Sequence, residues 1–157
     1  MNLQCENIGL KLVISESLIN TIHQKGIQQY PNEFGGLLVG KYSEDMKTCF
    51  IEETIIPIKY KSSKYYFERG KEGVFEKLQA FYNQEPRLIY IGEWHTHPDM
   101  TPEPSETDKR AMLEIAEHKE VLINSPVLII LGITRNKIEI GAYIQFKNKL
   151  HKYGKQN

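Results

Sequence analysis

The sequence predicts a single α/β domain in which a mixed β-sheet lies between helices. Segments with apolar residues at every second position alternate with segments whose apolar residues recur every three or four positions, which is typical of strands and helices respectively. The chain has 157 residues, 40% of them hydrophobic and 25% charged, so it is long enough to bury a core. We assign residues 1–146 to the domain and residues 147–157 to a polar, lysine-rich C-terminal tail.

The chain is expected to begin with a strand followed by a capped helix. Residues 8–14 have the pattern of a short strand, and the Ser15 hydroxyl can cap the helix that follows. This helix should fail near Gly26 and end by Tyr30-Pro31, because the residue before a proline avoids the α region.

A β-hairpin should follow this helix. The segment FGGLLVGKY, residues 34–42, has the composition of a strand whose glycines let another backbone approach closely. Residues 48–58 form its antiparallel partner, reached through the polar turn SEDMK. We interpret residues 59–65, KYKSSKY, as a polar loop.

Two helices and a strand are expected in the second half of the chain. Residues 73–82 have helical spacing with one apolar face, and residues 88–97, LIYIGEWHTH, form a strand. A second capped helix is expected from Ser105 to about His118. Its core-facing residues should be Ala111, Met112 and Ile115.

The last part of the chain predicts two more strands. Residues 126–133, PVLIILGI, are nearly all apolar, which indicates a central strand covered on both faces. Residues 137–146 alternate apolar and more polar side chains, so one face should be buried and the other exposed to water. The remaining tail, residues 147–157, is expected to be a frayed, solvated end.

The charge and cysteine content narrow the class of protein. Twenty basic residues balance twenty acidic ones, so the overall charge does not favour binding to nucleic acid or to an anionic membrane. Cys5 and Cys49 are too few for a disulfide framework and suit a reducing compartment. With neither a signal-peptide pattern nor a long apolar run, the sequence predicts a cytoplasmic protein without a membrane partner.

The stretch IGEWHTHPDMTPEPSETD, residues 91–108, contains the residues that we interpret as a metal site. His95 and His97 project from the same face of a strand, roughly 6 to 7 Å apart along it. Pro98 ends the strand directly after the second histidine, which places the pair at a sheet edge or in a cleft. By itself, such a pair is more often structural than metal-binding.

A carboxylate can complete the metal site. Ser105 is a good helix N-cap, and Asp108, in the first turn, can point to a metal or back to the helix amides. Plain capping is the commoner role of such a pair. Together with His95 and His97, however, Asp108 gives three protein ligands, the number that catalytic zinc uses beside a water molecule. His23, His118 and His151 are scattered and are interpreted as surface residues.

An open zinc site also needs a proton acceptor, and the residues alone leave its identity open. Glu33 lies where a helix gives way to the glycine-bearing strand, a junction that can present a side chain at a sheet edge. Glu93, on the same strand face as the two histidines, is an equal candidate. Glu52 and Glu53 lie within a strand and are weaker candidates.

These residues together resemble a known signature. Glu33, then His95-Thr96-His97-Pro98, then Ser105 and Asp108 resemble the signature of the JAMM (MPN+/JAB) zinc metalloproteases in order and spacing. The resemblance spans about residues 15–144 and implies a three-layer α-β-α domain, the MPN/JAB fold, similar to cytidine deaminase. It also implies that His95, His97 and Asp108 bind one Zn²⁺ ion.

The same resemblance implies the catalytic roles. Glu33, preferred over Glu93 only because of the family pattern, would hold and deprotonate the zinc-bound water. Ser105 would donate a hydrogen bond to the oxyanion of the tetrahedral intermediate, beside its capping role. A JAB/MPN+ metalloprotease domain over residues 1–146 is therefore expected.

The resemblance also implies a class of substrate. Family members cut peptide or isopeptide bonds after the C-terminus of ubiquitin-like proteins, and this chain most resembles the deconjugating protease of bacterial CBASS antiphage operons. Such a protease removes a cGAS-like nucleotidyltransferase from targets to which E1/E2-like enzymes attached it. Two alternatives stay open: a peptidase that matures the tail of a ubiquitin-like sulfur carrier, and a module that binds a tail without cutting it.

The substrate tail is expected to bind in an extended form, as a strand added beside the sheet. The segment 59–82 is the natural partner surface, with Tyr65, Tyr66 and Phe67 as candidate contacts. The alternative, which we favour at this stage, is that these aromatic side chains pack against the helix at residues 74–82.

Overall fold

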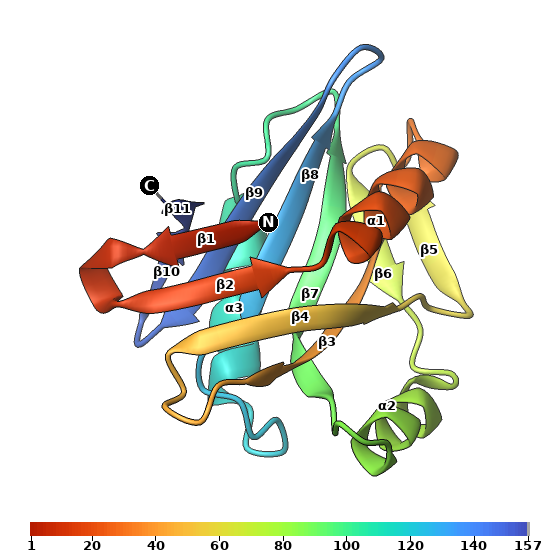
Figure 1. Ribbon diagram of the computed structural model, residues 1–157. Coiled ribbons are helices and arrows are strands. Elements are labelled where there is room, and N and C mark those ends of the chain that lie inside the picture. Colours follow the sequence, from red (N-terminus) through yellow and green to blue (C-terminus); the bar gives the residue numbers. More distant parts are fainter. Residues whose placement is uncertain (157) are drawn as a thin grey trace.

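A computed structural model describes residues 1–156 of the chain and shows one large sheet with helices on both faces (Figure 1). The helices are the short 3-10 helix η1 (Glu6–Ile8) and the α-helices α1 (Glu16–Gln29), α2 (Val74–Asn83) and α3 (Glu106–Glu117). The strands are β1 (Asn2–Cys5), β2 (Leu10–Ile14), β3 (Gly35–Tyr42), β4 (Thr48–Ile55), β5 (Tyr60–Ser63), β6 (Tyr66–Arg69), β7 (Ile89–Pro98), β8 (Val127–Ile133), β9 (Ile138–Phe146), β10 (Lys149–Lys152) and β11 (Gly154–Lys155).

The large sheet is mixed. Its nine strands follow the order β10-β9-β8-β7-β3-β4-β2-β1-β11, and β5 and β6 form a separate two-stranded sheet. The pairs β2–β4 and β7–β8 are parallel, whereas the other pairs of the large sheet are antiparallel. The antiparallel hairpin of β3 and β4 was predicted correctly, although β4 ends at Ile55 rather than at residue 58.

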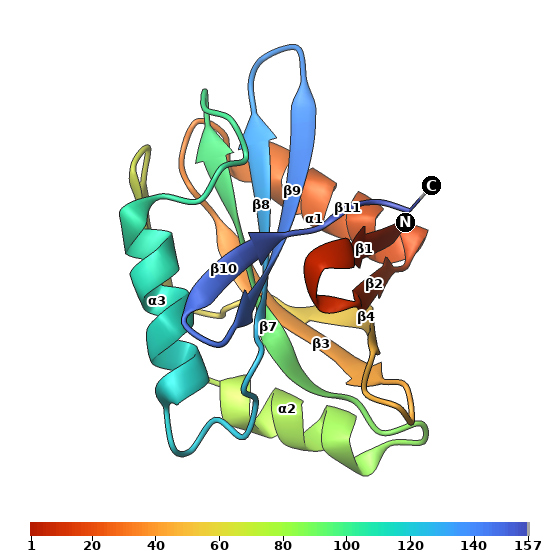
Figure 2. The same cartoon turned by 90° about the vertical axis from the view of Figure 1, so that its left-hand side faces the viewer.

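Strand β8 shows how the layers are arranged. All seven of its residues are buried. Val127, Ile129 and Leu131 join the core cluster that includes α1 residues, whereas Leu128 and Ile130 join the cluster beneath α3. Figure 2 shows α1 and α3 on opposite sides of the strands. The predicted single domain, with a mixed sheet between helices, is therefore confirmed.

Helix α1 begins at the predicted cap and ends before Tyr30-Pro31, as predicted, but it continues past Gly26, where it was expected to fail. The Ser15 hydroxyl accepts a hydrogen bond from the Leu18 N–H at 3.2 Å. Gly26 does not end the helix, which runs to Gln29. A Cβ atom at Gly26 would lie 2.8 Å from Ile133 Cδ1 and 2.9 Å from Thr96 Cγ2. Glycine at this position therefore permits close packing of the helix on β7 and β8.

The interpretation of residues 59–65 as a polar loop was wrong, because much of this segment belongs to the antiparallel hairpin of β5 and β6. Phe67 packs edge-on against Phe34, with ring centroids 5.6 Å apart. Tyr65 and Tyr66 are 73% and 49% exposed. The favoured interpretation that all three aromatics pack against the 74–82 helix was therefore also wrong.

Helices α2 and α3 bury fewer residues than their sequence patterns predict. Val74, Leu78 and Phe81 of α2 pack on a cluster below β3, but Phe75 is 71% exposed. In α3, Met112 is buried, whereas the side chain of Ala111 is exposed, contrary to the prediction. Within the described residues, none of the helices has the length and apolar character needed to cross a membrane.

The C-terminal part of the chain departs from the prediction. Tyr143 and Gln145, expected on the wet face of β9, are 3% and 2% exposed. The tail is not a frayed end: β10 pairs with β9, and β11 pairs with β1 across Leu3 and Lys155. Tyr153 between them is 5% exposed. Asn157, the last residue of the predicted tail, lies outside the described residues.

Candidate metal centre

The two histidines predicted as ligands lie at the carboxyl end of β7, on the sheet face that carries α3. In the parallel pairing of β7 with β8, His95 lies beside Ile130, which belongs to the apolar cluster under α3. The Nε2 atoms of His95 and His97 are 3.0 Å apart. Because β7 lies between β3 and β8, the pair sits at the end of an inner strand rather than on an edge strand.

Asp108 reaches the same point from the first turn of α3. Its Oδ1 lies 3.1 Å from Nε2 of His95, and its Oδ2 lies 3.4 Å from Nε2 of His97. Ser105 and Asp108 also form a complete capping box. The Asp108 N–H donates to the Ser105 hydroxyl at 3.1 Å, and the Ser105 N–H donates to Asp108 Oδ2 at 2.7 Å. The capping and metal-binding interpretations of Asp108 are therefore compatible.

The loop between β7 and α3 lies close against the sheet, and this contact sets the position of Asp108. A Cβ atom at Gly132 would lie 2.6 Å from the carbonyl oxygen of Met100, and one at Gly141 would lie 2.4 Å from that of Pro102. The Tyr143 hydroxyl donates to the Pro102 carbonyl at 2.7 Å. Two glycines thus make room for the loop, and a buried tyrosine holds it.

The electrostatics of the site favour a charged Asp108. Burial alone would raise the pKa of this carboxyl, but hydrogen bonds to His95 and His97 hold it well below its usual range. Burial alone would lower the pKa of His97, yet contacts with Asp108 and with the Thr101 carbonyl raise it. Nδ1 of His97 lies 3.4 Å from that carbonyl, so an Nδ1–H can donate to it and leave Nε2 facing His95 and Asp108.

The donor atoms fit a single metal ion. One ligand atom from each of His95, His97 and Asp108 lies within 4.8 Å of the others. Tetrahedral zinc with bonds of about 2.0–2.1 Å holds its ligand atoms about 3.3 Å apart. The three separations between their donor atoms, 3.0, 3.1 and 3.4 Å, are close to that spacing. Two imidazoles and a carboxylate form a donor set of the kind that catalytic zinc uses, with one position left for water.

Glu33 lies beside this group, just before β3. Its neighbour Phe34 pairs with the residue between the two histidines: the Phe34 N–H donates to Thr96 Oγ1 at 2.9 Å, and the Thr96 N–H donates to the Phe34 carbonyl at 2.8 Å. Burial raises the pKa of the Glu33 carboxyl; the charges of His95 and His97 oppose this shift, whereas that of Asp108 adds to it. Glu33 is thus close enough to interact electrostatically with all three ligand residues.

Two of the three alternative bases, Glu93 and Glu52, are engaged elsewhere. Glu93 Oε1 accepts a hydrogen bond from Arg69 Nη2 at 3.0 Å, so its charge is already paired. Glu52 forms a salt bridge of 2.9 Å with Lys41. These pairings favour Glu33 over Glu93 and Glu52, a choice that the residues alone left open.

Ser105 contacts the ligand side chain directly, because its hydroxyl donates to Asp108 Oδ2 at 2.7 Å. The structure therefore shows Ser105 orienting Asp108, whereas its role toward an oxyanion stays a prediction. Sequence reasoning missed the residues that support the loop, Gly132, Gly141 and Tyr143. A signal was present, since glycines inside otherwise apolar strands often mark a close approach of another backbone.

Fold and site together define a class of protein: a single α/β domain with two histidines on a strand and an aspartate at a helix start, arranged to bind one metal ion. Residues 15–142 match the family described as prokaryotic homologs of the JAB domain. The chain belongs to this family, which confirms the resemblance based on Glu33, the two histidines, Ser105 and Asp108.

Two curated relatives cover most of the chain. It is 40% identical over 122 residues to a CD-NTase/cGAS isopeptidase from Enterobacter hormaechei subsp. hoffmannii, a match that covers 77% of this chain and 67% of the relative. It is 29% identical over 123 residues to a protein of Sinorhizobium fredii described as probable metalloprotease y4qB, with 75% and 73% covered.

A solved structure is similar in fold. The solution structure of protein DSY2949 from Desulfitobacterium hafniense has a TM-score of 0.60 and 18% sequence identity to this chain, with 90% of this chain and 88% of that one covered. At this identity the likeness concerns the fold alone. The similarity to cytidine deaminase stays a prediction.

Proposed function

We propose that this protein is a zinc-dependent isopeptidase that releases a conjugated cGAS-like nucleotidyltransferase from its targets. The convergence of His95, His97 and Asp108 at the end of β7, with Glu33 beside them, is the observation that carries the proposal. Its support from relatives is the match to the isopeptidase of Enterobacter hormaechei, whose name states an action on CD-NTase/cGAS. A bacterial conjugation system with E1/E2-like enzymes would supply the substrate, and the cytoplasm is the expected location.

The side chains supply the steps of amide hydrolysis. When bound by His95, His97 and Asp108, zinc provides a Lewis acid that lowers the pKa of a bound water to about 7. The Glu33 carboxylate would take a proton from the attacking water as its oxygen bonds to the amide carbon, and would pass that proton to the lysine amine as the C–N bond breaks. A carboxyl whose pKa is raised by burial suits this exchange, because it binds and releases a proton closer to neutral pH.

The β5–β6 hairpin is the proposed binding surface for the substrate tail. It is a two-stranded sheet, so each strand has an outer edge at which an extended peptide can add. The hairpin reaches the base directly, since the Ser63 carbonyl accepts a hydrogen bond from the Glu33 N–H at 2.8 Å. Tyr65 and Tyr66 at its turn are exposed and are therefore available to contact a tail.

A trapping experiment in the native host tests the reaction. Wild type, Glu33→Ala and the control Glu52→Gln would be expressed, and lysine-linked peptides would be identified by mass spectrometry. Removal of the base should slow cleavage by about 10² or more, so a nucleotidyltransferase joined to lysine should accumulate only with Glu33→Ala. Glu52 lies in a surface ion pair, and its substitution should leave conjugates at the wild-type level.

The results also separate the competing activities. Cleavage of a linear tail after its C-terminal residues, with no action on a lysine-linked adduct, would favour maturation of a sulfur carrier. Stable binding of an uncut conjugate by zinc-loaded wild type would favour a tail-binding module. Equal conjugate levels with wild type and Glu33→Ala would contradict the isopeptidase proposal.

A further inference from the structure

Asp99 lies two residues after His97 and joins three segments that surround the metal centre. Its Oδ1 accepts a hydrogen bond from the Tyr30 hydroxyl at 2.7 Å, and its Oδ2 lies 3.1 Å from the Lys64 ammonium. Tyr30 caps the C-terminus of α1, and Lys64 lies in the turn between β5 and β6. One carboxylate therefore connects α1 and the hairpin to the end of β7.

The two connected segments are those that hold Glu33. Along the chain, Glu33 follows Tyr30 by three residues. Through space, the Glu33 N–H donates to the carbonyl of Ser63, the residue before Lys64, at 2.8 Å. These links form a closed ring. Asp99 contacts Tyr30, the chain runs from Tyr30 to Glu33, Glu33 bonds to Ser63, and Lys64, the next residue, contacts Asp99 again. Glu33 cannot move far from the end of β7 without opening one of these contacts.

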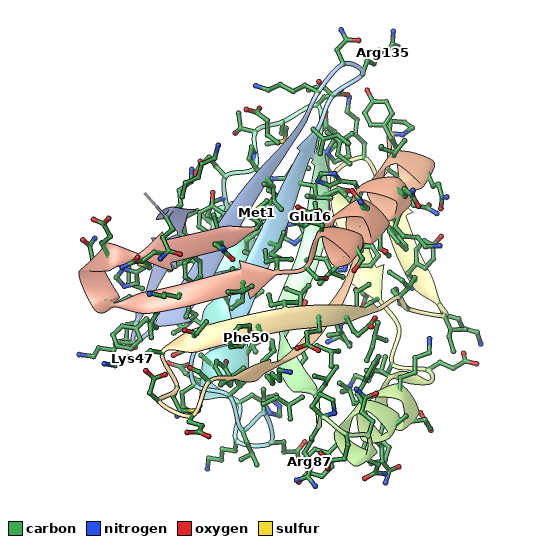
Figure 3. All side chains as sticks on the ribbon, in the orientation of Figure 1. Met1, Glu16, Lys47, Phe50, Arg87 and Arg135 are labelled. Atoms are coloured by element: carbon green, nitrogen blue, oxygen red, sulfur yellow. The ribbon has the colours of Figure 1, made fainter. Side chains whose placement is uncertain are left out.

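The backbone and surroundings of Asp99 suit this role. Its φ of 58° lies in the left-handed region, which aspartate tolerates better than most residues. The Asp99 N–H donates to the Ile133 carbonyl at 2.7 Å, which fixes the residue to β8. Hydrogen bonds from Tyr30 and Lys64 lower the pKa of its carboxyl, and Arg135 contributes further positive charge. Figure 3 shows Arg135 at the turn of the long β8–β9 hairpin.

Stability alone does not account for this arrangement. The side chains of Lys64 and Asp99 are 43% and 40% exposed, and ion pairs this open to solvent contribute little to folding. Their effect is instead geometric, because the same carboxylate restrains two of the segments around Glu33, in addition to the hydrogen bonds between Phe34 and Thr96. Small displacements of a catalytic group reduce turnover strongly, by about 10² per ångström.

We propose that Asp99 is a positioning residue that holds the general base at the metal centre, by tying the end of α1 and the β5–β6 turn to the strand that carries the histidines. The inference rests on the proposed function, in which Glu33 is the base. Asp99 itself acts only through Tyr30 and Lys64.

Three variants test the contacts of Asp99 with Tyr30 and Lys64. Asp99→Gly removes the carboxylate while accepting the positive φ, so its effects do not arise from backbone strain. Asp99→Asn keeps an acceptor for the Tyr30 hydroxyl and should restore part of the wild-type behaviour. Glu72→Gln is the matched control, because it breaks an exposed ion pair of 2.9 Å with Lys59 near the other end of the same hairpin.

The first measurement is amide hydrogen exchange at Glu33 by NMR, with zinc content determined in parallel. Since the Glu33 N–H is part of the ring, its exchange should rise about five- to tenfold in Asp99→Gly and less in Asp99→Asn. Zinc stoichiometry should stay at the wild-type value, as should exchange at Glu33 in Glu72→Gln. Unchanged exchange at Glu33 in Asp99→Gly would overturn the inference, whatever the activity.

The second measurement is cleavage of the conjugate. In Asp99→Gly, kcat should fall about tenfold while KM changes less, because the base is displaced and the binding edges persist. Raised exchange with a wild-type kcat would also overturn the inference. If wild type cleaves no conjugate but exchange still rises in Asp99→Gly, the restraint of Glu33 by Asp99 is supported and the proposed function alone fails.

Discussion

The two faces of the nine-stranded sheet differ in how their side chains are used. On the α1 face, twenty buried residues form one continuous core. On the opposite face, the core is divided into two clusters of four buried residues each, one beneath α2 and one beneath α3. Between them, β7 carries the polar side chains of Glu93, His95 and His97. One face therefore supplies most of the apolar burial, and the candidate metal ligands occupy the interruption in the other.

A core substitution on the α1 face should change stability without changing the site. Leu131 on β8 is 0% exposed and belongs to the continuous core. Leu131→Ala should lower the free energy of unfolding by about 2–5 kcal/mol, as large-to-small core changes do, with zinc stoichiometry unchanged in the folded fraction. Urea denaturation checks the loss, and Leu131→Met should cost below about 1.5 kcal/mol. Loss of zinc in folded Leu131→Ala would contradict the division of roles.

Metal loading should stabilise the protein through the other face. Zinc at about one hundred times its dissociation constant should raise the free energy of unfolding by about 2.7 kcal/mol, because only the folded state brings the three ligands together. Thermal or urea unfolding with and without zinc measures the change. His97→Ala should bind zinc more weakly and lose most of the stabilisation. If zinc raised the free energy of unfolding of His97→Ala as much as that of wild type, zinc would bind at another site.

The glycine under the loop allows a sharper test, because it affects the site from outside the ligand set. In Gly132→Ala, the new Cβ would meet the Met100 carbonyl at 2.6 Å and the Pro102 nitrogen at 2.9 Å, both backbone atoms. Displacement of the loop should cost about 1–3 kcal/mol of stability and weaken zinc binding. Calorimetric titration with zinc measures the second effect. Wild-type affinity would show that the loop does not set the position of Asp108.

The smallest expected effect concerns the hydrogen bond that holds the same loop. Tyr143→Phe removes the hydroxyl that donates to the Pro102 carbonyl and should cost about 1 kcal/mol. Urea unfolding provides the measurement, and Tyr42→Phe serves as a comparison, because Tyr42 packs on the core cluster of the α1 face. Zinc affinity should fall only in the Tyr143 variant. A fall of equal size in both variants would point to a general loss of stability.

Much of the fold, and the meeting of His95, His97 and Asp108, could be predicted because the signals are local. The apolar run at residues 126–133 predicts a fully covered strand, and the spacing of His95, His97 and Asp108 predicts ligands on neighbouring elements. Contacts between distant segments were not predictable in this way. Burial of Tyr153 depends on the strand pairing of the tail, and the continuation of α1 past Gly26 depends on packing against Thr96.

The choice between the two candidate bases shows the same limit. Glu33 and Glu93 are equal candidates in the sequence pattern, because nothing near Glu93 along the chain indicates a cationic partner. The structure brings Arg69 of β6 to Glu93 at 3.0 Å and leaves Glu33 beside the ligands. The preference for Glu33 as the candidate base thus depends on contacts that form only when the hairpin and the sheet come together.

The hydrogen bonds between Phe34 and Thr96 join residues 62 positions apart, whereas the three ligands lie within one short stretch, from His95 to Asp108. The three candidate ligands therefore come from segments close together along the chain, namely β7, its loop and the first turn of α3, and β8 and β9 support the loop. To bring Glu33 beside these ligands, the two ends of a much longer segment, Phe34 and Thr96, must meet. A partly folded chain whose β3 has not docked would carry the three candidate ligands without Glu33, so the site of the proposed mechanism is complete only after the long-range topology has formed.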